Sequence, residues 1–253
     1  MKSWVQCLSI LLIAMTSLMN LGRAEASCQG GGCRNYSDGI VKGEVVYNAG
    51  RNSMMATVIA IQPNGKFVLR FADGQVGGGW DRSDLAVMRG CVSNVCVGDI
   101  VYDSGRNSML ATVVGIQVNG KLTLKFADGQ VGSGWDVSDL AVRAGCSGQV
   151  CVGDIVYDAG RNSMMAKVVG LQSDGKLTLS FVDGQVGSGW DTSDLAATKG
   201  CSNGLCVGQS VIDVARNSMQ ATIVGIQPNG KFTLKFADGQ VGAGWDYSDL
   251  ACL

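Results

Sequence analysis

Two motifs in this sequence carry side chains that could recognise a ligand. Arg106 begins the motif Arg-Asn-Ser-Met, and Trp135 follows a Gly-x-Gly segment. An arginine binds carboxylates and stacks on aromatic rings, and a tryptophan offers a flat surface to a sugar, a peptide or a cationic group. Both motifs occur four times, with the arginines at Arg51, Arg106, Arg161 and Arg216 and the tryptophans at Trp80, Trp135, Trp190 and Trp245. We predict that these side chains form ligand-binding surfaces.

A tyrosine accompanies the arginine and the tryptophan in three of the four copies, as Tyr47, Tyr102 and Tyr157. Each follows a valine on a short predicted strand. Because successive side chains of a strand point to opposite faces, the valine takes the core face and the tyrosine the other. A tyrosine and a tryptophan on one rim would make a stacking surface. The fourth copy has Ile212 instead, so we expect it to bind differently or not at all.

Structural roles compete with these predictions. The tryptophans could close a small apolar core rather than present an exposed surface. Arg106 could pair with Asp128 or Asp136 of its own copy rather than with a ligand. Met109 is expected to anchor the arginine loop in the core.

The sequence offers little for catalysis. It has no histidine, the residue most often used as a general base or a metal ligand. Ser138 and Asp139 are adjacent, which favours a helix-capping role over a nucleophile and its base. Asp128 and Asp136 could supply oxygen ligands, but the chain has no Asp-x-Asp-x-Asp-Gly calcium loop. We therefore predict a non-enzymatic protein with no catalytic residues, no metal site and no cofactor.

A repeat of 55 residues places these motifs along the chain. Glycine is abundant (37 residues) and proline rare (2 residues), which favours short strands joined by tight turns. In the second copy, residues 111–117 are rich in β-branched side chains and residues 121–126 alternate between apolar and polar. Asn119-Gly120 and Asp128-Gly129 are typical of hairpin turns. Each copy is therefore predicted to be a β meander.

We predict an all-β fold of four tandem small barrels, each with four to five short antiparallel strands, because closing a sheet removes its edges. The copies resemble SH3-like barrels, particularly Tudor and agenet-type domains, in Gly98-Asp99, in Ala111-Thr112-Val113 and in the hairpin from Phe126 to Gly129. That resemblance implies an aromatic cage for methylated side chains. A four-bladed β-propeller is the alternative. The predicted repeats span 41–91, 96–146, 151–201 and 206–253.

The cysteines recur in C-x4-C pairs at the ends of the copies, a pattern that favours disulfides over zinc ligands. Two pairings compete. In one, each pair closes on itself (28–33, 91–96, 146–151 and 201–206) and Cys252 is left over. In the other, which we slightly prefer because longer loops gain more, each copy is clamped at its ends and Cys28 is left over. The clamp residues are Cys33 with Cys91, Cys96 with Cys146, Cys151 with Cys201, and Cys206 with Cys252. The remaining cysteine is expected to be free or to pair between molecules.

Residues 1–26 are expected to be a signal peptide, with Lys2 before an apolar stretch and Ala24-Glu25-Ala26 at the cleavage site. Residues 27–40 then form a cysteine-containing segment before the first repeat. Removing the leader leaves 18 basic and 20 acidic residues, which gives no electrostatic footprint for nucleic acid. We expect export to the periplasm or cell surface and no membrane span.

The favoured function is multivalent binding of an envelope glycan, peptidoglycan or peptide through the repeated aromatic and arginine surfaces. The alternative is a structural spacer without a small ligand. An exported hydrolase is the third hypothesis.

Overall fold

The computed structural model describes residues 39–253 except 215 and 217. This part of the chain consists of strands and four short 3-10 turns, which confirms the all-β prediction. Its helical turns are all too short to cross a membrane. The predicted signal peptide, most of the segment 27–40, and Cys28 and Cys33 lie outside the described residues.

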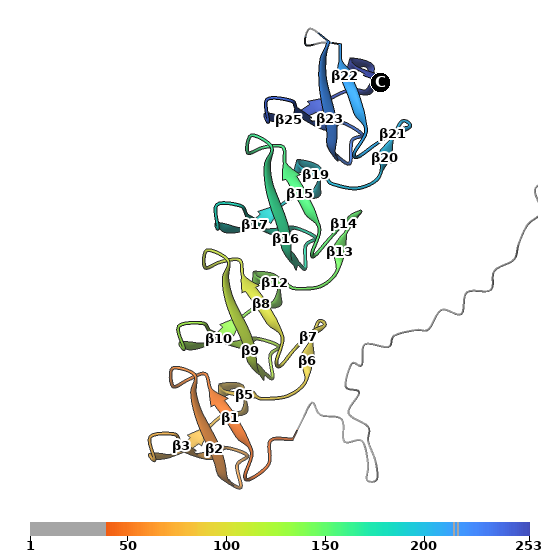
Figure 1. Cartoon of the computed structure of the whole chain (residues 1–253). Coiled ribbons are helices and arrows are strands. Elements are labelled where there is room, and N and C mark those ends of the chain that lie inside the picture. Colours follow the sequence, from red (N-terminus) through yellow and green to blue (C-terminus); the bar gives the residue numbers. More distant parts are fainter. Residues whose placement is uncertain (1–38, 215, 217) are drawn as a thin grey trace, which may run out of the picture. The chain divides into compact units, whose positions relative to one another are not determined.

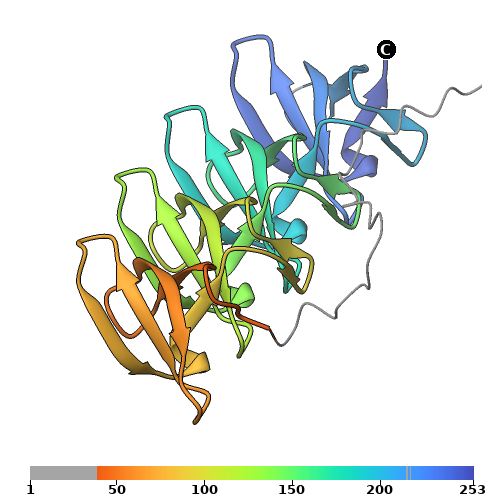
Figure 2. The same cartoon turned by 90° about the horizontal axis from the view of Figure 1, so that it is seen from below.

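Each repeat contains five strands, with a 3-10 turn between the fourth and the fifth (Figure 1 and Figure 2). Repeat 1 has β1 (Val45–Asn48), β2 (Met54–Ile61), β3 (Phe67–Phe71), β4 (Val76–Trp80), η1 (Arg82–Asp84) and β5 (Leu85–Val87). Repeat 2 has β8 (Ile100–Asp103), β9 (Met109–Gln117), β10 (Leu122–Phe126), β11 (Val131–Trp135), η2 (Val137–Asp139) and β12 (Leu140–Val142). Repeat 3 has β15 (Ile155–Asp158), β16 (Met164–Gln172), β17 (Leu177–Phe181), β18 (Val186–Trp190), η3 (Thr192–Asp194) and β19 (Leu195–Ala197). Repeat 4 has β22 (Ser210–Asp213), β23 (Met219–Ile226), β24 (Phe232–Phe236), β25 (Val241–Trp245), η4 (Tyr247–Asp249) and β26 (Leu250–Cys252).

The turns of the meander form where the sequence predicts them. Gly120 has a φ of 82° and Gly129 a φ of 85°, in the left-handed region that favours glycine. The side chains before them accept backbone N–H groups two residues on, since Asn119 Oδ1 receives Lys121 N at 3.1 Å. The predicted capping role of Asp139 is confirmed. Asp139 is the last residue of η2, and its carboxylate accepts the backbone N–H of the N-cap residue Asp136 at 3.3 Å.

The described residues contain no closed barrel, so the prediction of four small barrels is not confirmed beyond its all-β class. Within a repeat the fifth strand pairs with the first, and the first four pair in sequence. No pairing in the described residues joins the fourth strand to the fifth, so the sheet of each repeat stays open. All four repeats instead share one antiparallel sheet of 20 strands. Pairing between repeats joins only consecutive ones in these residues, so no ring of propeller blades forms either.

The fifth strand of each repeat joins it to the next repeat. β5 pairs with β9 through Ala86↔Gln117 and Val87↔Ile116. β12 pairs with β16 in the same way, and β19 pairs with β23 through Ala197↔Ile226. The edge that a closed barrel would remove within one repeat is therefore covered by the following repeat. We call these three contacts the first, second and third interfaces.

A glycine in the second strand makes room for each interface. A Cβ atom on Gly170 would lie 2.9 Å from the Cβ of Ala141 in the preceding repeat, closer than two carbon atoms can pack. Gly115 faces Ala86 and Gly225 faces Ala196 in the same manner. Repeat 1 has Ala60 at this position, and that side chain is exposed.

Hydroxyl groups also cross two of the interfaces. Ser53 Oγ bonds Ser133 Oγ of the next repeat at 2.7 Å, and Ser133 Oγ bonds Thr123 Oγ1 at 2.7 Å. At the second interface the matching groups are Ser108, Ser188 and Thr178, again at 2.7 Å. At the third interface Ala243 replaces the middle serine, and the buried hydroxyl of Thr233 has no hydrogen-bond partner.

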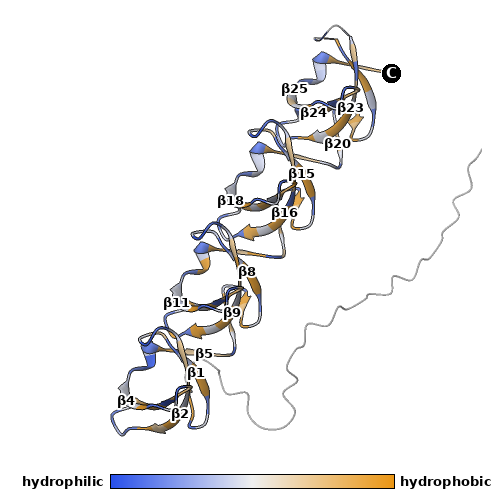
Figure 3. Cartoon of the chain, turned by 60° about the vertical axis from the view of Figure 1, so that its left-hand side comes forward, coloured by the Kyte–Doolittle hydropathy of each residue, from blue (hydrophilic) through white to orange (hydrophobic). Residues whose placement is uncertain are grey.

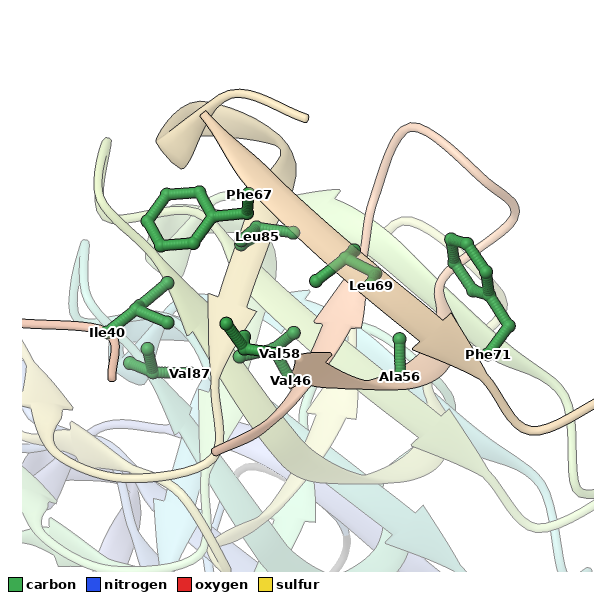
Figure 4. Packing of buried hydrophobic residues seen from close by; sticks show 9 residues of the cluster. All are labelled: Ile40, Val46, Ala56, Val58, Phe67, Leu69, Phe71, Leu85 and Val87. Carbon is green, nitrogen blue, oxygen red and sulfur yellow. The ribbon is translucent and has the colours of Figure 1, made fainter. Parts of the chain in front are cut away.

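Each repeat has its own apolar cluster. In repeat 1, Val46, Val58 and Leu69 face a common interior from three adjacent strands (Figure 4), and all three are fully buried. Hydrophobic residues are concentrated on the strands, whereas the 3-10 turns are mostly hydrophilic (Figure 3). The predicted core position of the valine on the first strand is confirmed in all four repeats.

The clamp pairing of the cysteines is wrong. Cys91 bonds Cys96, Cys146 bonds Cys151, and Cys201 bonds Cys206. Each pair closes a two-stranded hairpin, formed by β6 (Cys91–Val92) with β7 (Val95–Cys96), β13 (Cys146–Ser147) with β14 (Val150–Cys151), and β20 (Cys201–Ser202) with β21 (Leu205–Cys206). The two cysteines face each other across the hairpin at a Cα–Cα distance of 3.9 Å, because a two-residue turn joins the strands. Cys252 is free and exposed.

Replacing Gly170 by alanine tests the packing of the second interface. We expect Gly170→Ala to lower the free energy of unfolding by about 1–3 kcal/mol, since the new methyl group overpacks against Ala141. Urea unfolding followed by tryptophan fluorescence measures the change. Gly39→Ala is the matched control, because a Cβ there meets no atom within 4 Å and its stability should stay unchanged or rise slightly. Equal stability of the two variants would contradict the close contact.

Candidate functional site

In every repeat an arginine lies over the ring of a phenylalanine. In repeat 2 the Cζ of Arg106 is 5.4 Å from the ring centre of Phe126 and 5.6 Å from that of Trp135. We call this group, with its equivalents in the other repeats, the arginine stack. The equivalent phenylalanines lie 4.2 Å from Arg51, 4.7 Å from Arg161 and 5.7 Å from Arg216. Arg106 and Arg216 also lie near a tryptophan of their own repeat, and the phenylalanine was not among the predicted site residues.

The loop after the first strand holds the arginine in place. Arg106 N donates to Asp103 O at 3.3 Å, and Met109 N donates to Arg106 O at 3.0 Å. Asn107 and Ser108 between them have φ values of 49° and 55°, which are costly for side chains other than glycine. The loop is anchored by Ser108, which is buried and bonds the next repeat. Met109, the predicted anchor, is instead exposed.

The tryptophan of the stack is half-buried, and a buried carboxylate holds it. Trp135 Nε1 donates to Asp103 Oδ2 at 2.8 Å, and Asp103 is 1% exposed. Its other oxygen accepts Gly105 N at 3.0 Å. Trp190 bonds Asp158 and Trp245 bonds Asp213 in the same way. A carboxylate is a strong hydrogen-bond acceptor, so this aspartate fixes the orientation of the indole.

The tryptophan explains the first glycine of the Gly-x-Gly motif. A Cβ on Gly132 would lie 2.4 Å from Cη2 of Trp135, so only glycine lets the backbone of β11 lie against the indole. The ring of Trp135 packs at 5.5 Å from that of Phe126 on another side. The tryptophan is consequently part of the core wall as well as part of the stack.

Repeat 1 differs from the others at this site. Asn48 replaces the buried aspartate, and neither its amide nor the indole N–H of Trp80 has a hydrogen-bond partner. The indole is turned over, since its Nε1 lies nearest Gly77 and its Cζ3 nearest Gly50. Arg51 bonds Gln75 at 2.7 Å and Asp73 at 3.4 Å. The predicted pairing of the arginine within its own repeat therefore occurs in repeat 1, on the equivalent of Asp128.

The tyrosines do not share the surface of the tryptophans. Tyr47 is buried and lies on the opposite side of β1, where a Cβ on Gly115 of the next repeat would be 3.5 Å from its Cδ2. Tyr102 and Tyr157 occupy the same strand position and are half-buried. The ring contacts of the four tryptophans in the described residues are with phenylalanines. The combined tyrosine and tryptophan surface is therefore not formed, and repeat 4 keeps its arginine stack without a tyrosine.

No group of three or more metal-ligating side chains occurs in the part of the chain that the structure describes. In comparisons with known proteins, neither a family model nor a curated protein matched the chain.

Two substitutions at this position, Asp103→Asn in repeat 2 and Asn48→Asp in repeat 1, test the role of the buried carboxylate. We expect Asp103→Asn to lower the free energy of unfolding by about 1–3 kcal/mol, because the indole loses a hydrogen bond to a charged acceptor. The indole N–H resonance of Trp135 should move towards that of Trp80 in a 1H–15N spectrum. The reverse change, Asn48→Asp, should stabilise repeat 1 and move the Trp80 resonance the other way. If both variants leave the indole resonances in place, the carboxylate does not orient the ring.

Proposed function

We propose that the chain is a non-enzymatic, multivalent binding protein whose arginine stacks contact an extended ligand of the cell envelope. The proposal rests on one observation: the same arginine lies over the same aromatic ring in all four repeats. The arginines of repeats 2, 3 and 4 are exposed. A guanidinium held on a ring loses little freedom when it binds an oxygen acceptor, which favours recognition.

Several weak sites on one chain add their effects. Once one stack holds a polymer, the others meet it at a high effective concentration, so the overall affinity exceeds that of any single site. The proposed ligands are a glycan, peptidoglycan or a peptide that offers hydrogen-bond acceptors along its length. The three disulfides are typical of an oxidising, exported environment, which supports a partner outside the cytoplasm. The periplasm or the cell surface is the location that we propose.

A structural spacer is the second candidate. The strand pairing that runs from each repeat to the next supports it, because such pairing couples neighbouring repeats without any ligand. The free thiol of Cys252 would let such a spacer form a disulfide with another molecule. The resemblance to SH3-like and Tudor domains remains a proposal about fold, and the methyl-binding cage that it implies lacks its tyrosine here.

A charge-matched pair of variants separates the two functions. In the test variant, glutamine replaces Arg106, Arg161 and Arg216. In the control, glutamine replaces Arg70, Lys125 and Lys235, which are exposed cations outside the stacks. We expect retention on purified peptidoglycan to fall about a hundredfold in the test variant and to stay unchanged in the control. If neither set of changes affects retention, or if the native chain is not retained, the spacer is the better account.

A further inference from the structure

The third interface is built more loosely than the other two. It has a single pair of facing residues, Ala197↔Ile226, where the first and second interfaces each have two. Ala197 stands where repeats 1 and 2 have Val87 and Val142. The hydroxyl bond between repeats is also lost, because Ala243 replaces serine.

A cavity of about 280 Å³ lies at this interface. Its walls come from the hairpin of β13 and β14, the end of repeat 3, the start of the hairpin of β20 and β21, and the turn after β23. The shorter side chain of Ala197 lines it. A volume of this size, at the lower end of the range for ligand pockets, suits one sugar ring or an amino-acid-sized molecule.

The polar groups of the cavity are almost all uncharged. Amides and hydroxyls line it, namely Gln149, Thr192, Ser202 and Gln227. Gln227 is 8% exposed, and its Oε1, like that of Gln117 and Gln172 at the other two interfaces, has no hydrogen-bond partner in the described residues. A buried acceptor without a donor is costly, so a ligand O–H or N–H that reached it would be stabilised.

The one charged group of the lining is already neutralised. Lys199 Nζ bonds Asp154 Oδ2 at 2.5 Å. Burial raises the pKa of Asp154, but the hydrogen bond and the charge of Lys199, together with the N–H of Cys151, lower it below its ordinary value. Asp154 therefore pairs with Lys199 as a carboxylate, so the charge of the lining is balanced and an uncharged ligand suits it better than an ionic one. Apolar groups complete the lining, at Leu195, Ala197, Ile226 and Pro228.

We propose that the third interface is a binding site for a neutral, monosaccharide-sized ligand that donates a hydrogen bond to Gln227. A hexopyranose with an N-acetyl group has the required chemistry. Its hydroxyls and amide match the polar side chains, and its C–H faces and methyl group match the apolar ones. This site is separate from the arginine stacks and does not rest on the function proposed for them.

Titration of the full chain with N-acetylglucosamine tests the site directly. In 1H–15N spectra we expect shifts at Gln149, Ser202 and Gln227 with a dissociation constant of about 1 mM, a value ordinary for so small a ligand. Ala197→Val should weaken binding at least about tenfold by filling the cavity. That variant only restores the side chain found in repeats 1 and 2, so it should fold.

Two controls separate this site from other effects. Val142→Ala makes the opposite change at the second interface and should leave the shifts at Gln227 unaltered. Arg106→Gln removes an arginine stack and should also leave them unaltered, so the two proposed functions fail independently. The proposal is overturned if N-acetylglucosamine in large excess shifts none of the three residues, or if the native chain and Ala197→Val bind it equally.

Discussion

The pairing of each fifth strand with the next repeat is the interaction on which the rest of the structure depends. A repeat of this size buries little apolar surface on its own, and its open sheet leaves a strand edge unpaired. Ala86, Ala141 and Ala196 place that edge against Gly115, Gly170 and Gly225 of the following repeat. The edge is satisfied by a neighbour rather than by barrel closure. The first repeat can carry Ala60 because no described strand packs against that position.

In repeat 2 the same arrangement also supports the arginine stack. Ser108 bonds across the interface and lies beside Arg106 in the loop, so the neighbouring repeat helps to fix the guanidinium over its rings. The buried carboxylate of Asp103 orients the indole of Trp135 by accepting a hydrogen bond from its Nε1. Where the aspartate is replaced by Asn48, the indole turns over and the arginine pairs with Asp73. In repeat 1, therefore, the loss of the carboxylate, the turned indole and the ion pair of the arginine occur together.

Sequence patterns predicted the features that depend on local residues. The hairpin turns at Asn119-Gly120 and Asp128-Gly129, the valine core face and the Asp139 cap all follow from short-range chemistry. The open sheet could not be predicted in this way. Whether the sheet of a repeat closes on itself or pairs with a neighbour depends on contacts between repeats. The sequence feature that indicates pairing between repeats is Gly115, at a position where repeat 1 has Ala60. The disulfide pairing depends on the distance between the cysteines in the folded chain, and the length of the loop between them does not determine that distance. The predicted surface of tyrosine and tryptophan failed because the strand pattern gave the face of the tyrosines but not that of the tryptophans, which pack against phenylalanines.

The most direct test of the shared sheet is a measurement of backbone proton contacts across the second interface. Antiparallel pairing brings the backbones of Val142 and Leu171, and of Ala141 and Gln172, close together. An isotope-edited NOE experiment on the full chain should show cross-strand contacts between these residues, alongside those that join β12 to β8. Contacts of β12 with β8 but none with β16 would contradict the account, because each repeat would then fold without sharing its edge.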